Sequence, residues 1–174
     1  AGYRNEAGCV ALFATAVAGF VPFNFPRARV FMGDVGSGVL GLVIALAVLW
    51  QMTLPAIATA SGLVLCCAFA TDATCTLLSR LWRGRRWYSA HREHLYQWLV
   101  RCGWSHARVV ASYMGWNLLI VLPVVVWMNQ LPAGADAQRW LACGGAYAAA
   151  AGVWWVGKRL CLRAARAGGS HAPA

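Results

Sequence analysis

Five apolar segments separated by short polar loops constrain this chain more than any other feature of its sequence. They cover about residues 7–22, 36–52, 55–78, 107–128 and 138–157. Hydrophobic residues make up 60% of the 174 positions and charged residues only 11%, whereas soluble domains carry about 25% charged residues. About 20 apolar residues suffice for a helix to cross a bilayer. The composition therefore indicates a membrane protein.

The same segments predict the fold class. Lipid tolerates only helices and closed barrels, because every backbone polar group must be satisfied internally, and these segments lack the alternating pattern of barrel strands. We predict an all-α, polytopic integral membrane helix bundle with about five transmembrane helices. It forms one transmembrane domain over residues 1–166, and a disordered tail follows over residues 167–174.

Positive charge is concentrated in alternate loops. The formal net charge is +10, and Lys and Arg cluster in residues 23–35, residues 79–106 and the tail after Gly157. Because Lys and Arg are retained on the cytoplasmic side, these three segments are predicted to be cytoplasmic. Such a face suits anionic partners such as lipid headgroups, phosphates and nucleotide sugars. We expect no nucleic-acid partner.

Seven cysteines form no C-x-x-C pair, and most lie inside apolar runs. They do not predict a metal site or a disulfide framework. We expect reduced thiols that act as small apolar residues.

Asp34 is one of only five acidic residues, and it lies in the run FMGDVGSG just before an apolar segment. Two interpretations remain open. As a helix N-cap it would accept backbone N–H groups, which is worth about 1 kcal/mol. As an oxygen ligand it would suit Mg²⁺, which leaves its other positions to phosphates and waters. Gly33 lets the chain turn sharply and lets a bulky anion approach, and the two roles can coexist.

The run WYSAHREHLYQWL, Trp87–Leu99, combines aromatic, basic and apolar residues. His91 and His94 are spaced to share one face if the run is helical. One interpretation is an amphipathic interfacial helix that places Leu95 and its apolar neighbours in the lipid. The other is a cradle for a nucleotide diphosphate, because Arg and His donate hydrogen bonds to phosphate oxygens.

Asp72 lies inside the third apolar segment, where carboxylates are rare and usually face a cavity or a partner. Arg80 follows two turns later. A structural salt link between the two residues and an active-site role for Asp72 both remain open.

The run NFPRARVFMGDVGS, then an apolar segment, then TDATCTLLSRLWRGRRWYSAHREHLYQ, resembles the polyprenyl-phosphate N-acetylhexosamine-1-phosphate transferases. This is glycosyltransferase family 4, with phospho-N-acetylmuramoyl-pentapeptide transferase and undecaprenyl-phosphate GlcNAc-1-phosphate transferase among its members. The resemblance covers about residues 24–97. It implies an enzyme that transfers a sugar-1-phosphate from a UDP-N-acetylhexosamine to a polyprenyl phosphate and releases UMP. It also implies a place at the cytoplasmic face of the bacterial plasma membrane, in the initiation of O-antigen or other cell-envelope polysaccharide.

The resemblance assigns roles to individual residues. It implies catalytic roles for Asp34, as ligand of Mg²⁺ or alternatively Mn²⁺, and for His94. It implies that Arg92 binds the substrate and that Asn24 shapes the loop around it. The arguments from residue chemistry add Gly33 and His91 to the substrate-binding set.

The sequence departs from the family in two respects. Tyr96 and Gln97 stand where many members carry histidines, which bears on the identity of the substrate. The family's D-D-x-x-D and N-x-x-N-x-x-D-G motifs, which precede this region, do not occur in these residues. We therefore expect the C-terminal half of such an enzyme, inactive without the N-terminal half.

Two other classes of protein remain open. The first is a non-catalytic membrane anchor. The second is a transporter fragment, whose polar groups should line a path through the bilayer, but Asp72 is the one candidate in the apolar segments. A homodimer is a further candidate assembly.

Overall fold

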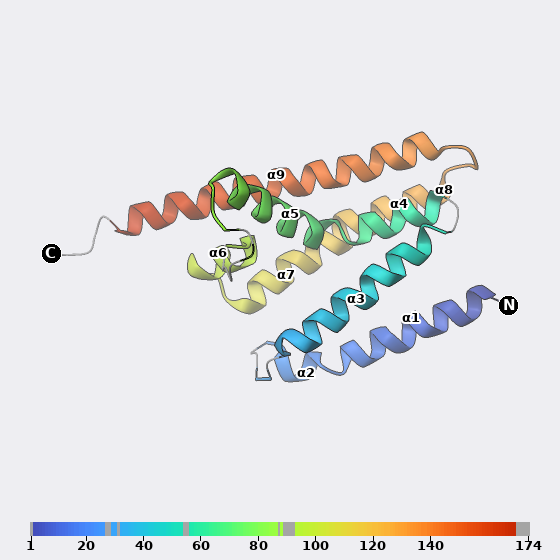
Figure 1. Cartoon of the computed structure of the whole chain (residues 1–174), viewed down its shortest axis with the longest axis horizontal. Coiled ribbons are helices and arrows are strands. Elements are labelled where there is room, and N and C mark those ends of the chain that lie inside the picture. The colour runs from blue at the N-terminus through green and yellow to red at the C-terminus, as the bar shows by residue number, and fades with distance from the viewer. Residues whose placement is uncertain are drawn as a thin grey trace. The chain divides into compact units, whose positions relative to one another are not determined.

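The computed structural model describes residues 2–26, 29–30, 32–53, 56–86, 88 and 93–169. In these residues all regular secondary structure is helical, which confirms the predicted all-α class (Figure 1). The elements are α1 (Gly2–Ala18), α2 (Val21–Asn24), α3 (Gly33–Gln51), α4 (Ala56–Leu65), α5 (Cys67–Trp82), α6 (Leu95–Arg101), α7 (His106–Trp116), the π-helical turn η1 (Asn117–Val121), α8 (Leu122–Gln130) and α9 (Asp136–Gly169). The chain divides into two compact units, residues 1–41 and 42–174, which are described separately.

The first unit contains α1, α2 and the beginning of α3. Apolar side chains of the α1–α2 segment and of α3, including Phe13, Phe20 and Leu40, line a shallow hollow of about 450 Å³. Gly36 permits a close approach within this unit, because a Cβ atom there would lie 2.5 Å from Cγ of Met32. These contacts fix the start of α3 to the segment that precedes it.

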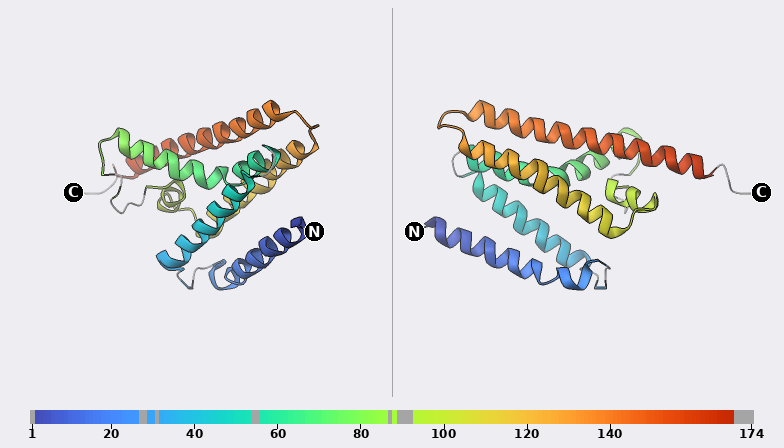
Figure 2. Two further views of the ribbon diagram at one scale, coloured as in Figure 1. Left: turned by 45° about the vertical axis from the view of Figure 1, so that its right-hand side comes forward. Right: turned by 180° about the vertical axis from the view of Figure 1, so that it is seen from behind.

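The long helix α9 is the central element of the second unit. It packs against α4, α5, α6 and α8, and Figure 2 shows it running alongside them. The buried core contains mainly small or medium side chains from α4, α5, η1, α8 and α9: Ala60, Val64, Cys67, Val121, Met128, Cys143 and Ala146. Small residues at these positions let helix backbones approach closely.

Helix α9 extends beyond the predicted end of the fifth apolar segment at Gly157 and continues to Gly169. Residues 167–169 of the expected tail are therefore helical, and residues 170–174 lie outside the described residues. The reason is local: residues 158–167 contain no Gly or Pro and are mostly Ala, Leu, Lys and Arg, which are good helix formers. With 34 residues, α9 is about 51 Å long at 1.5 Å per residue.

The third apolar segment does not form the continuous helix that we expected. It is divided into α4 and α5, which are bent by 68° at a break around Cys66. At this bend the carbonyl of Leu63 accepts hydrogen bonds from the Cys66 N–H at 3.2 Å and from the Tyr147 hydroxyl at 3.0 Å. The tertiary bond from α9 gives this carbonyl a partner where the helix is interrupted.

The fourth apolar segment is continuous from α7 through η1 to α8 but changes its helical pitch. Pro123 lacks an N–H and so cannot pair with the carbonyl four residues earlier, and the π-helical turn directly precedes α8. Among the described residues, His106–Gln130 is the one helix long and apolar enough to cross a membrane by itself. The bent pair α4–α5 would be a second if it is counted as one span, and residues 8–24 and 35–51 form shorter apolar helices. The five predicted spans remain a prediction.

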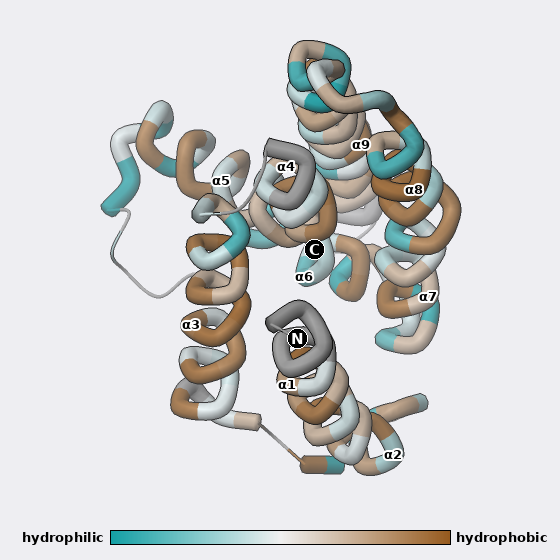
Figure 3. The backbone as a smooth tube through the Cα atoms, turned by 90° about the vertical axis from the view of Figure 1, so that its right-hand side faces the viewer, coloured by the Kyte–Doolittle hydropathy of each residue, from teal (hydrophilic) through white to brown (hydrophobic). Residues whose placement is uncertain are grey.

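Large apolar side chains are exposed along several helices. Leu42 on α3, Leu119 in η1 and Leu141 on α9 are 60%, 75% and 75% exposed, respectively. Figure 3 shows apolar residues around much of α3 and α8. Amphipathic surface helices of soluble proteins instead keep one polar face, and large exposed apolar patches mark surfaces that contact lipid or another protein.

Arg139 fixes the turn between α8 and α9. Its side chain is buried, with 4% exposure. The guanidinium donates to the carbonyls of Met128 (3.4 Å), Leu131 (2.7 Å) and Pro132 (3.0 Å) and pairs with Asp136 at 2.9 Å. These contacts satisfy carbonyl groups at the C-terminal end of α8 and just after it. No N–H group within the helix is left to donate to carbonyls at a helix end.

We predict that Arg139→Met destabilises the protein. The change removes the donor to three carbonyl groups, and leaving such groups unsatisfied costs about 1–3 kcal/mol in the free energy of unfolding. The measurement is the Tm of the purified protein in detergent. Arg163→Met is the matched control, because it removes the same charge from an exposed part of α9 and should change stability by no more than about 0.5 kcal/mol. Equal Tm values for the two variants would contradict this role of Arg139.

Candidate functional site

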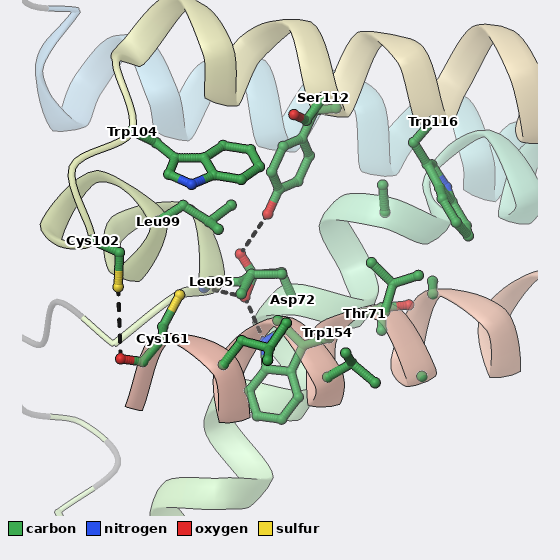
Figure 4. Close-up of a pocket in the computed structure, with 18 of the residues that line it drawn as sticks. Thr71, Asp72, Leu95, Leu99, Cys102, Trp104, Ser112, Trp116, Trp154 and Cys161 are labelled. Atoms are coloured by element: carbon green, nitrogen blue, oxygen red, sulfur yellow. Dashed lines mark hydrogen bonds between the residues drawn. The ribbon is translucent and has the colours of Figure 1, made fainter. Parts of the chain in front are cut away.

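Asp72 joins four helices through one buried carboxylate, which is 6% exposed (Figure 4). Its Oδ1 accepts hydrogen bonds from the Leu95 N–H and the Trp154 indole, both at 2.9 Å, and from the Thr76 hydroxyl at 3.3 Å. Its Oδ2 accepts from the Tyr113 hydroxyl at 3.3 Å. The carboxylate on α5 thereby connects the start of α6 with α7 and α9.

His94 lies directly before α6 rather than inside a helix. Its backbone is extended, with φ −62° and ψ 152°, and its N–H donates to Oε1 of Gln97 at 3.2 Å. Its Nδ1 lies 3.8 Å from Oδ1 of Asp72, and its ring stacks on Tyr96 with centroids 5.8 Å apart. Tyr96 and Gln97, which the sequence marked only as departures from the family, thus both contact His94.

The interpretation of Trp87–Leu99 as one continuous amphipathic helix does not hold over its described residues, because Glu93 and His94 are not helical and α6 begins only at Leu95. The physical reason is that the side chains of Asp72 and Gln97 accept the backbone N–H groups of Leu95 and His94 and so define the helix start. The same interpretation placed Leu95 in the lipid, but its side chain is buried in the protein, with 7% exposure. It packs so closely on Gly157 of α9 that a Cβ atom there would lie 3.1 Å from Cδ1 of Leu95.

Glu93 organises the basic loop before α6. Its Oε1 pairs with Arg80 at 2.6 Å and with Arg85 at 2.9 Å. Lys158 donates to the main-chain carbonyl of Glu93, and Arg80, 4% exposed, also donates to the carbonyl of Arg86 at 2.7 Å. The ion pair of Arg80 that we considered with Asp72 is therefore formed with Glu93, and it holds the loop on α5 and α9.

Cations and tryptophans stack around this loop. The Lys158 ammonium lies 5.0 Å from the Trp98 ring centroid and 5.7 Å from that of Trp154. Burial lowers the pKa of Lys158 to about 8, although Glu93 and Asp72 act in the opposite direction. Three Arg–Trp pairs occur in or next to α6, α7 and α9: Arg101–Trp98, Arg108–Trp104 and Arg159–Trp155. Such cation–π contacts combine positive charge with apolar rings, as membrane-interface residues do.

A cavity of about 810 Å³ lies beside Asp72, between α5, α6, α7 and α9 (Figure 4). Its walls are mainly apolar, with Leu95, Leu99 and Val153 among the lining residues, and Ser112 and Tyr113 add hydroxyl groups. Ligand sites typically combine such an apolar lining with a few polar groups. The cavity can hold an apolar group whose polar end reaches Asp72.

The loop before α3 contains the other predicted site residues. Oδ1 of Asn24 accepts from the Val30 N–H at 3.4 Å, and its Nδ2 donates to the Phe20 carbonyl at 3.3 Å. Gly33 has a φ of +70°, in the left-handed region that favours glycine. Asp34 follows in the first turn of α3, and its side chain lies outside the described part.

The predicted site residues are therefore divided between the two units. Asn24, Gly33 and Asp34 belong to the first, and His94 belongs to the second. His91 and Arg92 lie outside the described residues. Sequence reasoning missed Tyr113 and Trp154 as partners of Asp72. The available signal was a polar donor group within an apolar segment, but nothing in the sequence connected these two donors to Asp72.

Within the described residues, no group of three or more His, Cys, Asp or Glu side chains is placed to hold a metal ion. These residues alone do not make a complete metal site. Asp34 supplies the type of oxygen donor that Mg²⁺ prefers, so its carboxylate remains a candidate ligand.

Comparison with known proteins shows what the chain is similar to. Residues 2–52 match the family model described as "Glycosyl transferase family 4". The resemblance to this family is confirmed. A decaprenyl-phosphate N-acetylglucosaminephosphotransferase of Mycobacterium leprae (strain TN) is 32% identical over 127 residues, which cover 60% of this chain and 30% of that protein. A phospho-N-acetylmuramoyl-pentapeptide-transferase of Geobacillus kaustophilus (strain HTA426) is 34% identical over 132 residues, which cover 69% of this chain and 36% of that protein.

The chain thus spans about a third of the length of these two relatives. No solved structure matches it significantly.

We predict that Glu93 makes stability depend on pH. Burial raises the pKa of Glu93, but the Arg85 hydrogen bond and the charges of Arg80, Arg85 and Lys158 together lower it below the ordinary value of 4.5. A lowered carboxyl pKa adds stability that is present above the ordinary value and is lost as pH falls through the folded-state pKa. The Tm of Glu93→Gln in detergent should therefore be lower than wild type at pH 7 and should fall less on acidification to about pH 3, below the usual glutamate range.

Arg163→Met is the control, because it removes a charge from an exposed part of α9 outside this loop. It should retain the acid dependence of the wild type. An unchanged acid dependence in Glu93→Gln would contradict the role given to Glu93.

Proposed function

We propose that the protein containing this sequence transfers a sugar-1-phosphate from a UDP-N-acetylhexosamine to a polyprenyl phosphate such as undecaprenyl phosphate, releasing UMP. The match of residues 2–52, which include the FMGDVGSG run, to glycosyl transferase family 4 carries the proposal. The names of the relatives support it, since they describe the transfer of phosphorylated amino sugars, in one case to decaprenyl phosphate.

The reaction is a phosphoryl transfer between two anions. An oxygen of the polyprenyl phosphate attacks the phosphorus next to the sugar and forms a new P–O bond. The bond from that phosphorus to the bridging oxygen breaks, and UMP leaves with the electron pair. Catalysis of this kind depends mainly on positioning and on neutralising charge.

In this proposal the basic loop recognises the diphosphate. His94, Arg92 and His91 would donate to phosphate oxygens, and such charge-assisted bonds are stronger than neutral ones. The side chain of His94 is 27% exposed, which supports access from solvent. Asn24 and Gly33 would shape the loop that presents Asp34.

We propose Mg²⁺, replaceable by Mn²⁺, as the cofactor and Asp34 as one of its ligands. When bound, Mg²⁺ would neutralise charge on the diphosphate. Because one carboxylate holds Mg²⁺ weakly, further acidic ligands would come from the D-D-x-x-D motif of the family, which these residues do not contain.

We also propose a multi-pass location in the bacterial plasma membrane, with the basic loops at the cytoplasmic face and a role in cell-envelope polysaccharide synthesis. The apolar helix His106–Gln130 supports the membrane location, as do exposed apolar side chains such as Leu119. The Arg–Trp pairs support the proposal that the membrane–water interface lies near the basic loop.

The first test of this function is UMP release. Membranes containing the complete protein should release UMP from UDP-GlcNAc when given undecaprenyl phosphate and Mg²⁺, and EDTA should abolish the reaction. Asp34→Asn should lower turnover by about 10²-fold or more, the scale of a lost preorganised electrostatic contact. It should preserve the fold, since Asn keeps the size of Asp and an acceptor oxygen in the first turn of α3.

Asp136→Asn is the control and should retain activity. Activity retained in Asp34→Asn would leave Asp34 with a structural role only, at the start of α3. Turnover by the 174-residue chain alone would contradict the half-enzyme expectation. Failure of the complete protein to use any UDP-N-acetylhexosamine would favour a non-catalytic membrane anchor.

A second test concerns His94. His94→Ala in the complete protein should lower kcat/KM for the UDP-sugar by about 10²-fold, because one positioned donor to the diphosphate is lost. His106→Ala is the matched control, since His106 is exposed at the start of α7. Equal kcat/KM values for the two variants would show that His94 takes no part in the reaction.

A further inference from the structure

We propose that Asp72 is a positioning residue that holds His94 in the orientation needed to contact the nucleotide diphosphate. The inference rests on the proposed function and deepens it. It concerns a carboxylate for which the sequence left a structural and an active-site role equally open.

The environment of Asp72 makes it more than a helix cap. Its carboxylate is 6% exposed, and burying a charged group costs several kcal/mol before its contacts compensate. The groups that donate hydrogen bonds to it are the Leu95 backbone N–H, the Trp154 indole and two hydroxyl groups. A neutral Asn or Ser would cap α6 without the cost of charge burial, so the charge itself calls for an explanation.

The imidazole of His94 lies beside the carboxylate of Asp72. Nδ1 of His94 lies 3.8 Å from Oδ1 of Asp72. A carboxylate beside Nδ1 leaves the other ring nitrogen on the side of the imidazole that points away from Asp72. Nε2 is then the ring nitrogen with which His94 would contact a phosphate oxygen.

The backbone of His94 is fixed by the same carboxylate. Asp72 accepts the N–H of Leu95, the residue after His94, at 2.9 Å, and Gln97 accepts the N–H of His94 itself at 3.2 Å. The stacked ring of Tyr96 limits the side chain. Both the main chain and the ring of His94 are therefore held on the side that faces Asp72.

Two elements in turn hold Asp72. The Trp154 indole on α9 donates to Oδ1 at 2.9 Å, and the Tyr113 hydroxyl on α7 donates to Oδ2 at 3.3 Å. The far end of α6 is fixed as well, because the Cys102 thiol lies 3.7 Å from the Cys161 carbonyl. Displacements of about 1 Å in a positioned group can cost about 10²-fold in rate, so this support bears directly on turnover.

A double-mutant cycle on the complete protein tests the proposal. Asp72→Asn should lower kcat/KM by about 10- to 10²-fold in the wild-type background. When His94 is already Ala, the same change should lower kcat/KM by less than about twofold, because the effects of residues that act through one another are not additive. Tyr113→Phe, a milder change, should show a smaller loss with the same non-additivity. Asp136→Asn should keep the wild-type value. Equal fold losses in both His94 backgrounds, or no loss in either, would overturn the proposal.

Maleimide alkylation of Cys102, followed by mass spectrometry, measures the docking of α6 without any need for activity. Asp72→Asn should accelerate alkylation about fivefold, which corresponds to one lost hydrogen bond of about 1 kcal/mol. If the wild-type protein released no UMP, the proposed function would fail. Faster alkylation of Cys102 in Asp72→Asn would then still support the proposal that Asp72 positions the segment containing His94. An unchanged alkylation rate would overturn that proposal.

Discussion

A buried carboxylate requires hydrogen-bond donors around it, and the packing of the second unit satisfies this requirement at Asp72. Donors arrive from the start of α6, from α7 and from α9. If any of these elements moved away, a hydrogen bond to a buried charged group would be lost, and such bonds contribute about 1.5–3 kcal/mol each. The bend between α4 and α5 and the position of α6 are consistent with the meeting of these donors at the Asp72 carboxylate.

The basic loop next to Asp72 is held by ion pairs and cation–π contacts. Glu93 neutralises part of the charge of Arg80 and Arg85, and Lys158 is held by a carbonyl and by the faces of Trp98 and Trp154. These cations hold the loop in place, so their main contribution is structural. The proposed contacts with phosphate are left to His94, Arg92 and His91, and to the metal ligand proposed at Asp34.

The sequence predicted the helical class, the family resemblance and the identity of the basic loop, because apolar runs and short motifs are local features. It did not predict the start of α6 at Leu95, since that start depends on Asp72, which is 23 residues away in the chain. Nor did it predict the burial of Leu95 against Gly157. The sequence also did not predict the role of Gln97. A glutamine that replaces a family histidine cannot be distinguished, from the sequence alone, from one whose amide caps a helix.

The sequence by itself determined which segments are apolar, where positive charge gathers and which residues offer chemistry for a phosphate. These properties belong to residue types and their spacing. Only the tertiary structure decided that Asp72 would face His94, that Arg80 would pair with Glu93 and that Tyr147 would bond to the carbonyl at the α4–α5 bend. Each of these choices joins residues from different elements, and a geometry of that kind is fixed by helix packing and by the need to satisfy buried polar groups.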